Sequence, residues 1–280
     1  MLQLTVELRK SLLLVGLMAG ALAWAICNWF IAPSYQSKAV IFPPNTHANI
    51  HLVAAGIRFG NDKEVGEHLE IMSSVEVQNE MIMRFDLAQR YQLDTSAIYF
   101  ASNLVTAYTK NVHINRTLNK SLEIIVQDKS PEKAAEMANA LVAVSDEFKS
   151  RLIKKNIQVA FDAAKQPFIK KQKLVAIMSD SLEVLRQAGE VVWAFGEERK
   201  SGRYKNYELQ YLKELDRLGY LQEKFEELET LLFNPIPKSY VVSPAVAQPK
   251  PVAPKKLLIS ILASILAMGL LLGFKNIFSR

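Results

Sequence analysis

Two long apolar runs lie at opposite ends of this chain, at residues 12–32 and 257–274, and neither contains a charged residue. A helix needs about 20 apolar residues to cross the hydrocarbon core of a bilayer, and both runs are close to that length. The pattern therefore predicts two transmembrane helices. Residues 33–256, which lie between them, mix polar and apolar positions and are predicted to form one large water-facing domain.

Basic residues flank both runs on the side of the chain ends, and they predict the orientation. These residues are Arg9, Lys10, Lys275 and Arg280. Short flanks rich in Lys and Arg stay cytoplasmic, whereas long loops cross the membrane with little regard to their charge. Residues 1–11 and 275–280 are therefore predicted to be cytoplasmic, and the large domain is predicted to lie outside. Lys255 and Lys256 depart from this rule, because they stand at the outer edge of the second run.

A cleaved secretory signal is the alternative interpretation of the first run. Small-residue patterns typical of cleavage sites occur at 21–23 and 23–25. The apolar run continues past both sites through Trp29–Ile31, which favours an uncleaved helix. Cys27, the only cysteine, has no partner in the chain for a disulfide and is expected to be a bystander inside this helix.

Shorter patterns within the large domain predict a small base of strands and helices. The predicted strands are 36–42, 111–115, 121–127 and 240–242. Apolar residues that recur every three to four positions indicate two consecutive helices between 63 and 88 and a third over 97–108. The late strand is expected to return and pair with the first. These features define the fold class as an α+β membrane protein.

A long helix is predicted to begin at Ser130, Pro131 and Glu132. The serine can cap the free amides, the proline fits the first turn because no donor is needed there, and the glutamate complements the helix dipole. The apolar stripe continues to about residue 165. Pro167 is then expected to kink or interrupt the helix, because proline removes a backbone hydrogen bond.

Heptad-like spacing over 168–195 and 204–232 predicts an extended helical hairpin at about 168–232. The first arm carries its apolar series at steps of four and three: Met178, Leu182, Leu185, Gly189 and Val192. The polar, glycine-bounded segment 196–202 is expected to connect the arms. Each arm of this length would extend about 40 Å. The alternative is a helix pair that packs flat on a globular body.

Two further patterns concern the membrane anchors. A connector at 244–254 is rich in proline, which favours a stiff polyproline II spacer, and its prolines are Pro244, Pro249, Pro251 and Pro254. Glycines four residues apart occur in both apolar runs, and these are Gly16, Gly20, Gly269 and Gly273. Such small-xxx-small spacing lets helix backbones approach closely, so we expect transmembrane packing at these positions.

The net charge of +6 changes the picture little, because it is concentrated at the membrane flanks. Residues 33–254 hold 28 of the 34 Lys and Arg and 27 of the 28 Asp and Glu, so the large domain is nearly neutral. Nucleic-acid-binding domains concentrate basic charge on one face. This distribution excludes nucleic acid as a partner and leaves membrane lipid as the partner of the basic flanks.

The sequence contains no convincing catalytic or cofactor motif, so we expect a protein that is not an enzyme and binds no cofactor or metal. His47 and His51 have a spacing that could ligate a metal on a helix, but Pro43 and Pro44 disfavour a helix there and no third ligand is near. The acidic run Glu223, Glu226, Glu227 and Glu229 is interpreted as the wet face of a helix rather than as catalytic carboxylates.

Three stretches of the chain carry a resemblance to a known family. They are 33–42 after the first apolar run, 122–141 with a strand, a short turn and an amphipathic helix, and 251–256 directly before the second run. In these stretches and in its whole layout the sequence resembles the bacterial polysaccharide chain-length determinants, also called Wzz-type polysaccharide co-polymerases. The proline spacing at Pro244 and Pro249 is less regular than is usual in that family.

The resemblance implies a protein that sets the modal length of a surface polysaccharide, such as O antigen, enterobacterial common antigen or a capsule. Members of the family are inner-membrane proteins without catalytic activity. They form homo-oligomeric rings whose periplasmic domains rise as a bell, and they act on a separate polysaccharide polymerase that extends the growing glycan.

Two other functions are consistent with parts of the pattern. A membrane activator of a tyrosine kinase in capsule export would have the same two spans, but it is expected to carry an informative cytoplasmic tail, and only six residues follow Phe274. A periplasmic adaptor of an efflux or secretion pump would also use a helical hairpin. Such adaptors have one membrane anchor and β-rich flanking domains, which this pattern does not predict.

Overall fold

The structure is a computed structural model that describes residues 6–45 and 59–278, with side chains described for 11–45 and 59–273. The chain divides into two compact units. The base unit comprises Met1–Asp146 and Lys238–Arg280, and the hairpin unit comprises Glu147–Pro237.

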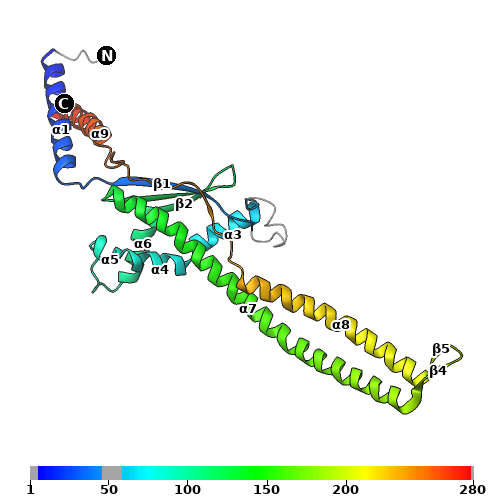
Figure 1. The fold of residues 1–280 in the computed structure, drawn as a ribbon. Helices are drawn as coiled ribbons and strands as arrows, with labels where there is room; N and C mark the ends of the chain where they lie inside the picture. The colour runs from blue at the N-terminus through cyan, green and yellow to red at the C-terminus, as the bar shows by residue number, and fades with distance from the viewer. Residues whose placement is uncertain (1–5, 46–58, 279–280) are drawn as a thin grey trace. The chain divides into compact units, whose positions relative to one another are not determined.

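The two predicted membrane helices are present in the base unit and pack against each other (Figure 1). Helix α1 spans Val6–Trp29 and helix α9 spans Lys256–Phe278. By length and apolar composition, both helices are long enough to cross a membrane. Cys27 is buried in α1 with a free thiol.

A four-stranded antiparallel sheet forms the centre of the base unit. Its strands are β1 (Tyr35–Phe42), β2 (Val112–Arg116), β3 (Leu122–Asp128) and β6 (Tyr240–Ser243), in the order β2-β3-β1-β6. Every second residue of β3 is buried, as expected for a strand with one face on the core. The predicted pairing of the late strand with the first is confirmed, since β6 lies antiparallel to β1.

Short helices follow the first strand, as their spacing predicts. They are α3 (Asp62–Met72), α4 (Val75–Arg84), α5 (Leu87–Arg90) and α6 (Phe100–Asn111). Asn61 and Glu64 form a capping box at the start of α3, which satisfies free amides of its first turn. The third predicted helix begins at Phe100 rather than at residue 97, because the Asp94 carboxylate accepts hydrogen bonds from Ser96 and holds a turn there.

Helix α7 spans Pro131–Leu185, and its first half covers the sheet. The Ser130 hydroxyl accepts a hydrogen bond from the Lys133 amide, which confirms the predicted cap. Fully buried residues on this half of α7 are Ala134, Met137, Ala138, Leu141 and Val144. They pack in the core with alternate residues of the sheet, and the core therefore lies between the sheet and α7.

Pro167 does not interrupt the helix, because α7 continues through it, so that half of the prediction is wrong and a kink at this residue stays a prediction. Proline already has a helical φ, so the cost comes mainly from one lost hydrogen bond and a local steric clash. Phe161 and Phe168 stand on either side of Pro167, and both rings contact Phe225 of the facing helix. This shared contact offsets the cost and keeps the helix continuous.

The hairpin unit contains the second half of α7, a π-helical turn at Arg186–Glu190, and helix α8 (Gly202–Phe233). The prediction that the first arm stays helical to residue 195 is wrong, since strands β4 (Val191–Ala194) and β5 (Glu197–Lys200) form a small hairpin at the tip. Gly189 has a positive φ of 83° and ends the helix, as glycine commonly does. The second arm agrees with its prediction.

The turn between β4 and β5 consists of Phe195 and Gly196, with φ values of 56° and 81°. Two positive φ angles define the turn type whose twist suits a two-residue β-hairpin. An aromatic residue with positive φ is uncommon and strained. The Phe195 side chain is 95% exposed, and the Arg199 guanidinium lies 5.6 Å from its ring centroid.

Candidate functional site: membrane base and helical hairpin

The two apolar helices α1 and α9 join the rest of the base unit side by side because the segments next to them are hydrogen-bonded. Ser34 follows α1, and Ala253 precedes α9. The Ser34 amide donates to the Ala253 carbonyl at 2.9 Å, and the Val252 amide donates to the Ser34 carbonyl at 2.8 Å. These bonds fix where the chain passes from α1 to the sheet and from the proline-rich connector to α9.

At Ala245 and Val246, the proline-rich connector is held by side chains rather than by a strand partner. The Ser37 hydroxyl donates to the Val246 carbonyl at 3.0 Å. Asn139 of α7 makes two reciprocal bonds of 2.9 Å with the backbone of Ala245. Connector prolines have no amide hydrogen, so these side chains replace the ladder that a strand would use. Sequence reasoning missed Ser37 and Asn139, because nothing in their local pattern indicates a partner so distant in the chain.

A buried polar cluster lies where the chain returns to the base. Asp146 of α7 accepts hydrogen bonds from the Ser239 amide at 3.0 Å and from the Ser239 hydroxyl at 2.7 Å, and its side chain is only 7% exposed. His68 of α3 is fully buried, with Nε2 3.3 Å from the Ser239 hydroxyl and 3.9 Å from the Asp146 carboxylate. Ser145 completes the cluster at 3.5 Å from the same ring nitrogen.

The glycines of the two membrane helices differ in their surroundings. A Cβ atom placed on Gly16 would meet the Met268 side chain at 3.0 Å, and one placed on Gly20 would collide with the Ser264 hydroxyl of α9. A Cβ atom on Gly269 or Gly273 would meet no described residue within 4 Å. Packing of the last two glycines therefore stays a prediction.

Aromatic and ionic contacts join the two arms of the hairpin unit. The Phe225 ring of α8 lies 4.7 Å from the Phe161 centroid and is stacked 5.2 Å from the Phe168 centroid. Lys171 of α7 pairs with Glu214 of α8, and this hydrogen bond is the main cause that lowers the pKa of the Glu214 carboxyl. The contacts recur along the arms, so the pair behaves as one structural element.

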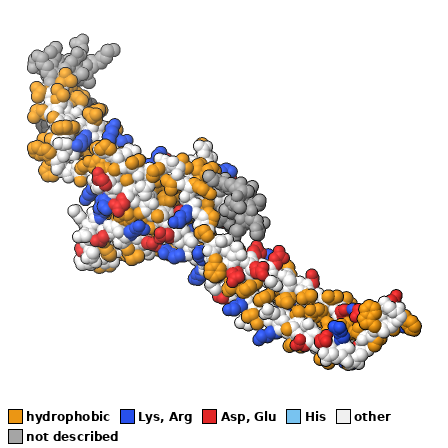
Figure 2. Space-filling model, viewed as in Figure 1, with side chains coloured by type: hydrophobic (Ala, Val, Ile, Leu, Met, Phe, Trp, Pro, Cys, Tyr) orange, Lys and Arg blue, Asp and Glu red, His pale blue; other side chains and the backbone are white. Residues whose placement is uncertain are grey.

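Many apolar side chains of the hairpin unit remain exposed after the arms have paired, and Figure 2 shows hydrophobic side chains along this part of the molecule. On α7 they include Val159, Ile177 and Val184, and on α8 they include Leu209, Leu212 and Tyr220. Exposed apolar area of this extent is typical of an interaction surface. The aromatic and ionic contacts that join the two arms are made within one chain.

Replacing Phe225 with alanine is expected to destabilise the pairing of the two arms by about 2–3 kcal/mol, because two aromatic contacts are lost at once. Hydrogen exchange over 155–172 would measure the change as faster exchange. Tyr220→Ala is the matched control, because Tyr220 lies on the same helix and is exposed. Equal protection in the two variants would contradict the role given to Phe225.

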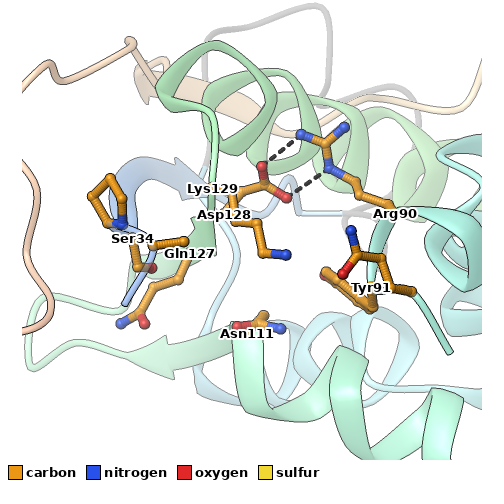
Figure 3. A pocket seen from close by; sticks show the side chains of 10 residues that line it. Ser34, Arg90, Tyr91, Asn111, Gln127, Asp128 and Lys129 are labelled. Atoms are coloured by element: carbon orange, nitrogen blue, oxygen red, sulfur yellow. Dashed lines mark hydrogen bonds and ion pairs between the residues drawn. The ribbon is translucent and has the colours of Figure 1, made fainter. Parts of the chain in front are cut away.

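A pocket of about 460 Å³ lies in the base unit where β1 begins and β3 ends. Its lining residues are Ala32, Pro33, Ser34, Arg90, Tyr91, Gln92, Asn111, Gln127, Asp128 and Lys129. The Arg90 guanidinium donates to both Asp128 oxygens, at 2.7 Å from Nε and 2.5 Å from Nη2 (Figure 3). The pKa of the Arg90 guanidinium is raised, mainly by its hydrogen bond with Asp128. Burial raises the pKa of Tyr91 to about 12.

The described residues contain no group of three or more His, Cys, Asp or Glu side chains that could hold a metal ion. His47 and His51, the candidate metal ligands of the sequence, lie outside the described residues. Within the acidic run on α8, Glu227 pairs with Lys224 at 2.7 Å, and Glu226 accepts a hydrogen bond from the Gln222 side chain at 2.9 Å.

Comparison with solved structures returned the class of protein that the sequence resembles. A full-length bacterial polysaccharide co-polymerase matches with a TM-score of 0.44 and 14% identity, covering 100% of this chain and 99% of the other. This chain is similar to the polysaccharide co-polymerases.

Two shorter structures show a comparable likeness. A fragment of WzzB, a polysaccharide co-polymerase from Salmonella Typhimurium, matches with a TM-score of 0.36 and 14% identity over 79% of this chain and 100% of the other. The Shigella flexneri lipopolysaccharide O-antigen chain-length regulator matches with a TM-score of 0.35 and 13% identity over 78% of this chain and 99% of the other. No protein-family model and no curated protein matches the chain.

Proposed function

We propose that this protein sets the modal chain length of a surface polysaccharide as an oligomeric co-polymerase of the bacterial inner membrane. It acts on a separate polymerase, and its base and hairpin lie in the periplasm. The polysaccharide belongs to the class of O antigens, common antigens or capsules. The observation that carries the proposal is the combination of two paired membrane helices with a long helical hairpin that keeps exposed apolar residues after its arms have joined.

The anchoring supports a role at the membrane surface. Helices α1 and α9 enter the base through the hydrogen-bonded segments at Ser34 and Ala253, so the base is tied to the bilayer at both ends of its chain. A growing glycan that is linked to a membrane lipid is extended at this same surface. The base is therefore held where the polymerase and its lipid-linked product must also lie.

The hairpin supports assembly from several copies. Helix α8 has 32 residues, which corresponds to a length of about 48 Å. Its exposed leucines, together with the apolar residues of α7, offer a long surface that a second copy of the chain can cover. The nearly neutral charge of residues 33–254 adds little repulsion between copies.

The proposal assigns no reaction to the protein itself. Three of its buried charged groups have structural partners: Asp128 pairs with Arg90, Asp146 accepts from Ser239, and Glu64 accepts from the Asn61 amide. The first two pairings tie together segments that are distant in sequence. The protein then influences glycan length by holding or releasing the polymerase and its product rather than by bond chemistry.

Deleting the protein from its host is expected to change the length distribution of one surface glycan without stopping its synthesis. Gel separation of lipid-linked polysaccharide measures the distribution, and a plasmid copy of the wild-type gene should restore it. Unchanged ladders for every glycan that the cell makes would refute the proposal. Loss of export together with loss of tyrosine phosphorylation on a kinase would instead identify the kinase-activator function.

A further inference from the structure

We propose that the pocket between the ends of β1 and β3 binds the phosphate group of a membrane lipid in the bilayer leaflet that faces the base. This site depends only on the two helices spanning a membrane, and it does not depend on the proposed role in glycan length. The ligand class is a lipid phosphate ester, either the phosphodiester of an anionic phospholipid or the diphosphate of a polyprenyl carrier.

The strand register places the pocket at the membrane end of the base. Strand β1 starts shortly after α1 ends, and its first residue, Tyr35, lies opposite Asp128, the last residue of β3. Ala32 and Pro33, which follow α1 directly, line the pocket themselves. Trp29 at the end of α1 is 84% exposed, and tryptophan at such a position typically lies at the level of the lipid headgroups.

The charges around the pocket leave one lysine available for an anion. The Asp128 side chain is 2% exposed, and both of its oxygens are occupied by Arg90, with a further bond of 2.8 Å from the Ser130 amide. Glu136, the other acidic residue that acts on Arg90, pairs with Lys133 at 2.6 Å.

Lys129, by contrast, is exposed and makes no ion pair or hydrogen bond with any described residue. Figure 3 shows its side chain extending between Gln127 and Tyr91. The net charge of the ionised lining groups Arg90, Lys129 and Asp128 is therefore positive.

Neutral donors complete a site suited to phosphate oxygens. The side chains of Ser34, Asn111 and Gln127 line the pocket and carry hydroxyl or amide donors. The Tyr91 hydroxyl is a further donor, since a phenol is protonated near neutral pH at its ordinary pKa of about 10, and burial raises this pKa to about 12. A volume of about 460 Å³ is ample for a phosphate headgroup.

The same site explains why Lys255 and Lys256 break the charge rule for membrane flanks. Both lie just after Ala253, which is bonded to Ser34 at the rim of the pocket. Lys256 donates to Asn28 of α1 at 2.7 Å, and Lys255 is exposed. Lysines near an anionic leaflet are attracted to its headgroups.

Native mass spectrometry of the full-length protein, released from nanodiscs, tests the site. The nanodiscs contain phosphatidylcholine alone, phosphatidylcholine with phosphatidylglycerol, or phosphatidylcholine with a polyprenyl diphosphate. We expect anionic lipid to be retained in preference to phosphatidylcholine. The variant Lys129→Gln should retain it about fivefold less, which is the contribution of one lysine near an anionic surface, and Lys129→Arg should behave as the wild type.

Lys120→Gln is the matched control, since Lys120 lies in the turn at the opposite end of β3 and is exposed. It should not change lipid retention.

Preference for phosphatidylglycerol or for the polyprenyl diphosphate identifies which lipid supplies the phosphate. Equal retention of phosphatidylcholine, or equal loss in Lys120→Gln and Lys129→Gln, would overturn the proposal. Inorganic phosphate can also be added to the protein. If it displaced all anionic lipid equally from the wild type and from Lys129→Gln, the proposal would also be overturned. None of these readouts involves glycan length, so this test and the deletion test fail independently.

Discussion

Asp146→Ala is expected to destabilise the base unit by about 3 kcal/mol, because it leaves two part-buried donors of Ser239 without an acceptor and removes the carboxylate beside His68. The carboxylate accepts from the amide and the hydroxyl of Ser239, and it lies beside the buried ring of His68. A loss of this size corresponds to a fall of about 6–12 °C in the melting temperature of a domain of this size. Circular dichroism of the solubilised protein during heating measures it.

Ser239→Ala is the matched control for this change. It removes only the hydroxyl donor, and the backbone amide of residue 239 can still bond to Asp146. We expect a loss of about 1 kcal/mol, which is the usual net contribution of one hydrogen bond. Equal melting temperatures for Asp146→Ala and the wild type would show that the cluster does not hold β6 to α7.

Gly20→Leu is expected to separate α1 from α9, because a side chain at this position collides with Ser264. Overpacking of a close contact costs about 1–3 kcal/mol. The single native cysteine reports the change, since Cys27 is buried in the wild-type protein. We expect maleimide to label Cys27 several times faster in the variant than in the wild type, as measured by a mass shift over time.

Gly269→Leu provides the same substitution at a position where a Cβ atom meets no described residue within 4 Å. Cys27 should stay protected in this variant. Gly273→Leu is also expected to keep the helix pair intact, while it weakens assembly of several copies if that glycine packs between them. Rapid labelling in Gly269→Leu, or slow labelling in Gly20→Leu, would contradict the packing of α1 on α9.

Local spacing alone predicted most of the elements. The two apolar runs, the strands around 36–42 and 121–127 and the cap at Ser130 follow from residues that are close in sequence, and the structure contains each of them. Helix and strand periods are properties of a short window, so a short window is enough to detect them. The family resemblance rests on the same kind of local signal, with the addition of the order of the elements along the chain.

Two local predictions failed where neighbouring structure outweighed a local preference. Pro167 stays inside a helix because Phe225 contacts aromatic residues on both sides of it. The heptad spacing that includes Val192 continues past the true end of the helix, because Gly189 takes a positive φ and the β-branched residues after it form a strand. In both cases the spacing of apolar residues along the chain does not reveal the deciding feature. That feature is a contact with the facing helix at Pro167 and a positive φ angle at Gly189.

The sequence by itself determined most of the helices and strands and the two long apolar helices, because those preferences depend on near neighbours. Only the tertiary structure decided which distant residues meet. Asn139 holds Ala245, Asp146 holds Ser239, and Arg90 holds Asp128 beside the pocket. Each of these pairs joins residues dozens of positions apart, and a side chain's type fixes what it can bond with but not which partner the fold brings to it. The pocket, and the hydrogen bonds of Asn139 that hold the connector, exist only once the fold has placed those partners together.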